Sequence, residues 1–237
     1  MTCPAMGQGR RPFLALLSLV GLLLGSSCQS NTIPVTEAFL SAQPRSILVL
    51  PPLDETVETA ATYGTLASVT RPLAEAGYYV FPVALVDAVM RQNGLPTPFE
   101  MHSVPVSKLI EIFDPDAILY LKVTDWGTSY QIIQSSTRIG ISGELVDART
   151  GVSLWSGSTV QVQNSNSGGG GIVGMLAGAL ANQIATSVSD PSRGIAARAN
   201  WELLGNRQSG WLLGPYHPRV EEDIQDLEAR YQAQVSP

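Results

Sequence analysis

Cysteine and histidine are the side chains that most often supply nucleophiles and metal ligands, and this 237-residue chain has two of each. Cys3 and Cys28 both lie near the amino terminus, whereas His102 and His217 stand alone in proline-containing loops. No two histidines have the spacing of a zinc motif such as H-x-x-x-H. The string Gly140-Ile141-Ser142-Gly143 lacks the second spacer of a G-x-S-x-G nucleophile elbow. We therefore expect no metal site, no cofactor and no enzymatic activity.

Cys28 has the surroundings of a cysteine that is processed and acylated. Arg10 and Arg11 form a short basic region, and the apolar run Phe13–Leu24 has the length of a secretory signal. A membrane-spanning helix would need about 20 apolar residues. Gly25-Ser26-Ser27 then leads directly into Cys28, and this segment resembles the lipobox at which bacterial lipoproteins are cleaved and lipidated. We assign residues 1–27 to a signal peptide and Cys28 to the lipidation site.

Cleavage at this point would leave the mature chain attached to a membrane by acyl chains such as palmitate. Gln29 follows the cysteine in place of the aspartate that retains many such proteins in the inner membrane, so we expect the outer membrane. We expect the protein on the periplasmic face, and the sequence leaves exposure at the cell surface open. Residues 28–45 have the composition of a lipidated cysteine and a tether. Cys3 would leave with the signal peptide, so the mature domain can form no internal disulfide. Met1 and Met6 both remain candidate starts.

The charge of the mature chain excludes some classes of partner. Removing Arg10 and Arg11 leaves 12 basic and 20 acidic residues, a formal net charge of −8. Nucleic-acid binding draws on clustered lysine and arginine, so we expect no nucleic-acid partner. Electrostatic attachment to anionic lipid is equally unsupported. Membrane contact is therefore left to the lipid anchor and to any apolar surface.

A small acidic group is the one candidate ligand site outside the amino terminus. Asp54, Glu55 and Glu58 follow the apolar run Ile47–Leu50, which is typical of a buried strand. Ligands of open α/β sheets tend to bind beyond the carboxyl ends of strands. The group would hold a cation or a small ligand, or it is a solvated acidic loop.

The glycine-rich stretch after residue 167 contains a literal G-x-G-x-x-G, Gly169 to Gly174, but no strand follows to carry a ribose-binding acid. We therefore expect no nucleotide. Ile172–Val188 is an uncharged apolar helix pattern, and small residues at four-residue spacing would allow close helix approach. These candidate interface residues are Gly170, Gly174, Gly178, Ala177 and Ala181. The helix packs on the sheet, forms a subunit or membrane-surface contact, or spans a membrane; the sequence leaves all three open.

The rest of the chain alternates strand and helix patterns and predicts one α/β (α+β) domain over residues 46–218. We expect a three-layer-like mixed sheet with flanking helices, a long antiparallel hairpin and the apolar Gly/Ala-rich helix. The expected strands are Ile47–Leu50, Tyr78–Phe81, Ala117–Val123, Thr128–Leu145 and Val152–Gln163. The expected helices are Thr62–Ala76, Leu85–Gln92 and Ser103–Phe113. Residues 219–237 form an amphipathic helical extension whose stripe Val220, Ile224, Leu227 and Tyr231 covers either the domain or a second chain.

Several strings of this chain resemble a family of bacterial outer-membrane lipoproteins of unassigned function that includes a meningococcal vaccine-candidate antigen. They are Ser46-Ile47-Leu48-Val49-Leu50-Pro51-Pro52, Ala61-Thr62-Tyr63-Gly64, the run from Pro72 to Pro82, Gly127-Thr128-Ser129-Tyr130, Leu154-Trp155-Ser156-Gly157 and Gly214-Pro215-Tyr216-His217-Pro218. The resemblance implies a fold similar to the curli secretion-channel lipoproteins and to the amino-terminal domain of the Tol-system propeller protein. It carries no catalytic residues.

Two functions are consistent with these features. The favoured one is a non-enzymatic, lipid-anchored lipoprotein that serves as an accessory or assembly subunit of an envelope secretion or transport complex. It would act as a homo-oligomer and with other envelope lipoproteins, docking through the Gly/Ala helix and a sheet edge. The alternative is a periplasmic module that binds a small ligand or cation near Asp54 and Glu55.

Overall fold

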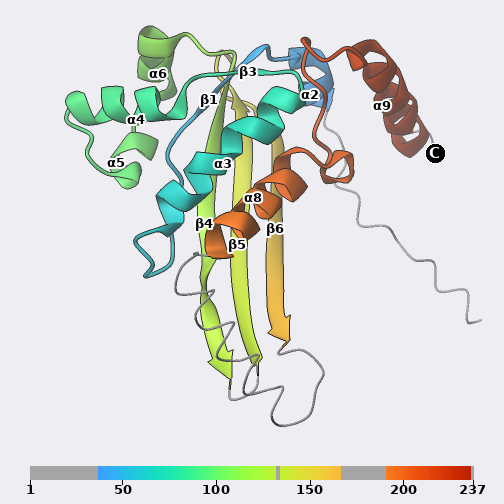
Figure 1. The fold of residues 1–237 in the computed structure, drawn as a ribbon. Helices are drawn as coiled ribbons and strands as arrows, with labels where there is room; N and C mark the ends of the chain where they lie inside the picture. Colours follow the sequence, from blue (N-terminus) through green and yellow to red (C-terminus); the bar gives the residue numbers. More distant parts are fainter. Residues whose placement is uncertain (1–36, 132–133, 167–190, 236–237) are drawn as a thin grey trace, which may run out of the picture. The chain divides into compact units, whose positions relative to one another are not determined.

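The computed structural model describes residues 37–131, 134–166 and 191–235. The strands of this part form one six-stranded sheet in the order β3-β1-β4-β5-β6, with β2 paired to β4 (Figure 1). They are β1 (Ser46–Val49), β2 (Leu53–Asp54), β3 (Tyr79–Val80), β4 (Ala117–Gln131), β5 (Gln134–Asp147) and β6 (Ser153–Asn166). Cys28 and the candidate interface residues Gly170, Gly174, Gly178, Ala177 and Ala181 lie outside the described residues, as does the predicted helix Ile172–Val188.

The sheet is parallel at one side and antiparallel at the other. β1 is parallel to both β3 and β4, and β2 is parallel to β4. β4, β5 and β6 pair antiparallel along almost their whole length. The mixed α+β class predicted from the sequence is confirmed. The expectation of one strand over Thr128–Leu145 is wrong, because β4 ends at Gln131 and β5 begins at Gln134, so that segment contains the end of one strand and most of the next.

The helices and the 3₁₀ turn of the described residues are α2 (Glu37–Ala42), α3 (Ala61–Glu75), α4 (Val83–Gln92), α5 (Pro98–His102), α6 (Val106–Phe113), α8 (Pro191–Leu204), η1 (Arg207–Ser209) and α9 (Val220–Val235). Ser103–Phe113, expected as one helix, is the end of a capped turn followed by α6. Thr97 caps α5 through a reciprocal capping box with Glu100, and Pro105 then begins α6. Among these described helices, none is long and apolar enough to cross a membrane.

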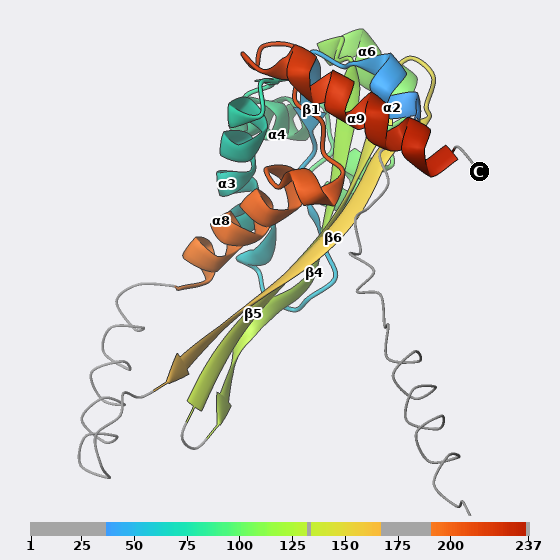
Figure 2. The same cartoon turned by 90° about the vertical axis from the view of Figure 1, so that its right-hand side faces the viewer.

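Two hydrophobic cores lie on opposite faces of the sheet because β1 is apolar on both of its sides. Ile47 and Val49 face a core closed by α3 and α8, whereas Leu48 faces a second core closed by α4, α5 and α6. Figures 1 and 2 show α3 and α8 side by side on the first face. Helices therefore cover both faces around β1 and the first half of β4, while the far ends of β4, β5 and β6 continue beyond them.

The first described helix changes the boundary of the predicted tether. Phe39 of α2 is fully buried in the larger core, where its ring meets Trp211 edge to face with centroids 5.8 Å apart. The tether predicted up to residue 45 is therefore too long, since the folded domain already includes α2.

The carboxyl-terminal helix α9 packs on the domain itself. Leu227 belongs to the larger core, and the Tyr231 hydroxyl donates to Glu37 of α2 at 3.2 Å. Asp223 is buried, accepts the main-chain N–H of Leu213 at 2.9 Å and pairs with Arg207. The apolar stripe of this helix thus packs on its own domain at Leu227. Of the two alternatives that the sequence left open, the domain or a second chain, the structure shows the domain at this residue.

Candidate functional site

The predicted acidic group does not assemble into a cation site. Asp54 uses Oδ1 to accept hydrogen bonds from the N–H and hydroxyl of Thr56, at 2.8 and 2.7 Å. Glu55 turns to Lys122 of β4, with 3.5 Å between Oε1 and Nζ. Glu58 is exposed. No group of three or more histidine, cysteine, aspartate or glutamate side chains suited to a metal ion occurs in the part of the chain that the structure describes.

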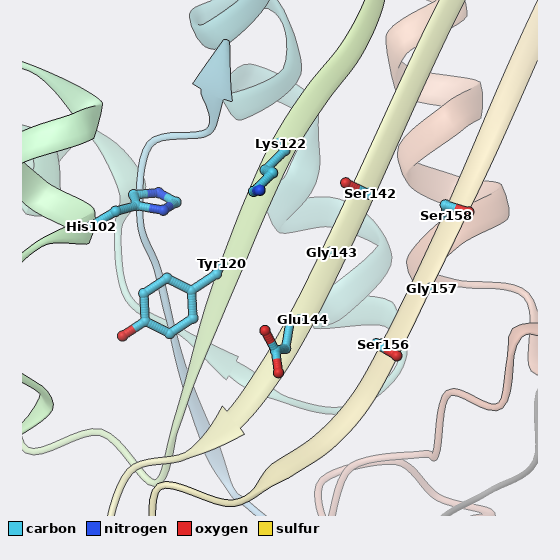
Figure 3. A pocket seen from close by; sticks show the side chains of 9 residues that line it. All are labelled: His102, Tyr120, Lys122, Ser142, Gly143, Glu144, Ser156, Gly157 and Ser158. Atoms are coloured by element: carbon cyan, nitrogen blue, oxygen red, sulfur yellow. The ribbon is translucent and has the colours of Figure 1, made fainter. Parts of the chain in front are cut away.

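A hollow on the outer face of β4, β5 and β6 is a concave site within the described chain. Its volume is about 460 Å³, within the range of about 300 to 1,000 Å³ typical of ligand pockets. Figure 3 shows His102 facing Tyr120 and Lys122 across the hollow, with the other lining residues on β5 and β6. The lining residues are His102, Tyr120, Lys122, Ser142, Gly143, Glu144, Ser156, Gly157 and Ser158.

Strand register arranges the floor of the hollow as two rows that cross the three strands. One row is Tyr120, Glu144 and Ser156, and the other is Lys122, Ser142 and Ser158. Residues two apart on a strand point to the same face, so all six side chains lie on the face opposite α3 and α8. All six end in a polar group, and three of them are the short side chains of Ser142, Ser156 and Ser158. The face is therefore polar and hollow where a larger side chain would fill it.

A pair of glycines keeps the other face of this region close-packed. Gly143 and Gly157 lie opposite each other in register. A Cβ on Gly157 would come within 2.5 Å of the Trp155 ring, and one on Gly143 within 2.9 Å of Leu121. The glycines thus make room in the core for the indole of Trp155, whose Nε1 donates to the Ser209 carbonyl at 2.6 Å.

His102 forms one wall of the hollow from the end of α5. Its Nε2 lies 2.9 Å from the Pro51 carbonyl, which can only accept, so Nε2 carries the proton and Nδ1 is left as an acceptor. Burial lowers the pKa of His102; the bond to Pro51 opposes this effect and the charge of Lys122 adds to it. The ring meets Tyr120 edge to face with centroids 5.3 Å apart. The imidazole is therefore a neutral wall, and its proton is directed at the main chain instead of a serine hydroxyl.

The charges around the hollow sum to an acidic site. Lys122 is already paired with Glu55, whereas Glu144 makes no hydrogen bond or ion pair with another described residue. Burial, and then the charge of Glu144, raise the pKa of Tyr120. One uncompensated carboxylate thus remains beside a neutral imidazole and a neutral phenol.

The outer edge of β6 is a second surface of interest. β6 is the last strand of the sheet order, and within the described residues no strand pairs with its outer side. Its fourteen residues include no charged side chain and no proline. Val160 and Val162 are 44% and 50% exposed. Natural edge strands of this length normally carry lysine, proline or a bulge that prevents pairing with another chain. In β6 the register shifts at Leu154, near its start, and the strand from Trp155 onward pairs with β5 without a further shift.

The sequence indicated only part of these two surfaces. No sequence pattern predicts that Tyr120, Lys122, Glu144, Ser156 and Ser158 are neighbours. The available signal was the alternation of serine and glycine in Ser142-Gly143 and in Ser156-Gly157-Ser158, which marks a strand with one close-packed and one open face.

Comparison with known proteins gives consistent matches. The family described as "Putative lipoprotein GNA1162-like" matches residues 36–216. "Putative lipoprotein NMB1124/NMB1162" of Neisseria meningitidis serogroup B is 43% identical over 203 residues, which cover 84% of this chain and 94% of that protein. The crystal structure of lipoprotein GNA1162 from Neisseria meningitidis matches with a TM-score of 0.50 and 49% identity, over 60% of this chain and 99% of that one. A PelC dodecamer structure from Paraburkholderia phytofirmans, 13% identical, matches with a TM-score of 0.42 over 69% of this chain and 88% of its own.

Proposed function

The chain belongs to the GNA1162-like lipoprotein family, and from this premise we propose that it is a lipid-anchored envelope protein that acts by assembly and not by catalysis. Its role would be that of an accessory subunit in an envelope secretion or transport complex. In this proposal Cys28 carries the lipid, Gln29 favours the outer membrane, and the domain lies on the periplasmic face. The folded domain, beginning at α2, presents its docking surfaces from there.

The outer edge of β6 is the observation that carries the proposal. An unpaired strand offers a row of free N–H and C=O groups to any extended segment that approaches. Charged side chains and prolines oppose such pairing, and β6 has neither. The exposed Val160 and Val162 add apolar area beside the free main chain. An edge with these properties is suited to pairing with another strand, which is a common mode of protein association.

A second copy of the chain fits this edge best. Two β6 strands that pair antiparallel would place uncharged residues opposite uncharged residues, so no like charges meet. A two-fold pairing of this kind uses the same surface on both subunits. Such homo-oligomers, together with other envelope lipoproteins, are the partners we propose.

The test is the oligomeric state of the full-length lipidated protein in mild detergent, measured by light scattering coupled to size exclusion. The double variant Val160→Lys, Val162→Lys places two charges on the edge. The matched control, Val57→Lys with Val152→Lys, adds the same charge at positions that are 96% and 47% exposed and outside β6. We expect oligomers for the wild type and the control, and monomers for the edge variant. Monomeric wild type, or an edge variant that assembles normally, would refute the proposal.

The Gly/Ala-rich segment remains a second candidate interface from the sequence. Gly174→Leu with Gly178→Leu would block close helix approach in any contact that those glycines make. We expect this variant to reduce assembly with the fold retained, as judged by circular dichroism. Normal assembly would remove the segment from the proposed interface and leave the β6 edge.

A further inference from the structure

The hollow on the outer face of β4, β5 and β6 has groups that the rest of the fold does not use. Within the described residues, the hydroxyls of Tyr120, Ser142, Ser156 and Ser158 form no hydrogen bond, and neither does the Glu144 carboxylate. Many serine hydroxyls elsewhere do: those of Ser41, Ser46, Ser68, Ser103 and Ser209 each have a protein partner. These groups line one concave site and are open to solvent, so a molecule seated there would meet donors and acceptors that no protein group occupies.

The unused groups define the chemistry of that ligand. A hydroxyl both donates and accepts, whereas the Glu144 carboxylate and the free Nδ1 of His102 only accept. The site therefore has more acceptors than donors, and the ligand must bring O–H or N–H groups. An anion would meet a net negative charge, because the single charge of Lys122, 3.5 Å from Glu55, stands against the two carboxylates of Glu55 and Glu144. The ligand is thus neutral or cationic and rich in hydrogen-bond donors.

The polar groups of the hollow extend in two directions, far enough apart to accommodate a ring. Neighbouring strands lie about 5 Å apart, and residues two apart on one strand are separated by about 7 Å. The rows Tyr120–Glu144–Ser156 and Lys122–Ser142–Ser158 therefore form a flat grid of polar groups with the dimensions of a ring that carries hydroxyls on its edge. His102 and Tyr120 add an aromatic wall at one side (Figure 3). A polar floor beside an aromatic wall matches the two kinds of surface that a sugar ring presents.

We propose that this hollow binds a saccharide with neutral or amine-bearing rings and rejects anionic ones. Glu144 would receive the amine or a ring hydroxyl, and Ser142, Ser156 and Ser158 would exchange hydrogen bonds with the other hydroxyls. The site lies on the open face of the sheet and does not require the β6 edge to be unpaired. Binding and assembly can therefore be tested separately.

The experiment compares three β-1,4-linked disaccharides of the same ring configuration that differ in the charge of their substituents: a glucosamine dimer, an N-acetylglucosamine dimer and a glucuronic acid dimer. Each is titrated against the full-length lipidated protein in a detergent without a sugar head group, with binding followed by ligand-observed NMR. We expect the amine and neutral dimers to bind and the acidic dimer to bind at least tenfold more weakly. Glu144→Gln should weaken the amine dimer about tenfold, since the substitution keeps an acceptor but removes the negative charge that strengthens its hydrogen bond to the amine. Glu111→Gln, an exposed position on α6 outside the hollow, should change nothing.

A cavity-filling pair of variants checks the location. Ser158→Phe places a ring in the hollow and should abolish binding of every dimer, whereas Ser153→Phe, on the same strand and exposed, should not. No binding by any dimer to folded protein would overturn the proposal. So would tightest binding of the acidic dimer, or binding that Ser158→Phe leaves intact. A linear diamine such as cadaverine that binds as tightly as the glucosamine dimer would also overturn it, because the site would then recognise only an amine.

Discussion

Replacing Gly157 with alanine is a direct test of how tightly the sheet and its core are packed together. The added Cβ would lie 2.5 Å from Cζ2 of Trp155, a distance that carbon atoms do not tolerate. Relief requires a movement of the indole. That ring is held by the hydrogen bond from Nε1 to the Ser209 carbonyl and by Trp211, whose ring meets it edge to face with centroids 4.7 Å apart.

The magnitude follows from two opposing effects. Overpacking of a well-packed core costs about 1–3 kcal/mol. Removing a glycine from a strand returns about 0.5–1 kcal/mol of backbone entropy. We therefore expect Gly157→Ala to lower the free energy of unfolding by about 1–2 kcal/mol, which corresponds to a fall in Tm of about 2–4 °C for each kcal/mol in a domain of this size.

Gly194→Ala is the matched control, because a Cβ at this exposed position of α8 meets no heavy atom within 4 Å. It should raise the free energy of unfolding by about 0.5–1 kcal/mol through helix propensity alone. Urea unfolding followed by circular dichroism measures both variants. A Gly157→Ala protein as stable as the wild type would show that Trp155 is free to move, and the account of the glycine pair would be wrong.

Three further predictions concern the terminal helices and the hollow. Phe39→Ala should lower the free energy of unfolding by about 3 kcal/mol, measured by urea titration. A loss below about 1 kcal/mol would indicate that α2 is part of the tether and not of the folded domain. Asp223→Ala removes the buried carboxylate that pairs with Arg207 and should lower the free energy of unfolding by about 2–3 kcal/mol. An unchanged urea midpoint would contradict the packing of α9 on the domain through Asp223. The lowered pKa of His102 means that the unfolded chain binds more protons just below pH 6.5, so stability falls as pH drops there. His102→Gln keeps a donor for Pro51 but does not titrate, so its urea midpoint should fall less than that of the wild type as pH drops from 8 to 5. Plots of urea midpoint against pH that run parallel for the two proteins would contradict this prediction.

The sequence predicted the parallel side of the sheet well because its signals are local. Ile47–Leu50 is apolar without interruption and is followed by two prolines, which is typical of a strand buried on both faces. The structure places β1 between two cores. Ala117 likewise begins a strand directly after the breaker Asp114-Pro115-Asp116.

The reversal between β4 and β5 could not be found in the same way. The residues from Gln131 to Gln134 include no glycine, proline, asparagine or aspartate, so the sequence has no turn signal between the end of β4 and the start of β5. α8 was missed for a related reason. The face it buries includes Ala196, Ala199 and Asn200, whose amide donates to the Thr65 carbonyl at 2.9 Å, and such residues give no apolar stripe.

The hollow depends on tertiary structure more than on any motif. Strand alternation predicts that Glu144 and the serines lie on one face of the sheet. It does not predict that α5 ends beside them, with His102 as a wall of the hollow. The acidic group shows the opposite case. Asp54 and Glu55 are close in sequence, yet one carboxylate completes a turn with Thr56 and the other pairs with Lys122, so proximity along the chain did not produce a site.

The central claim is that the protein assembles with itself through the edge of β6. The most direct measurement places a photo-crosslinking amino acid at Val162 in the full-length, membrane-anchored protein in a bacterial host, with Val152 as the control position. We predict a covalent dimer from Val162 after illumination, and none from Val152, which has similar exposure but lies in the turn before β6. Only monomer at Val162, or equal crosslinking at both positions, would contradict the claim.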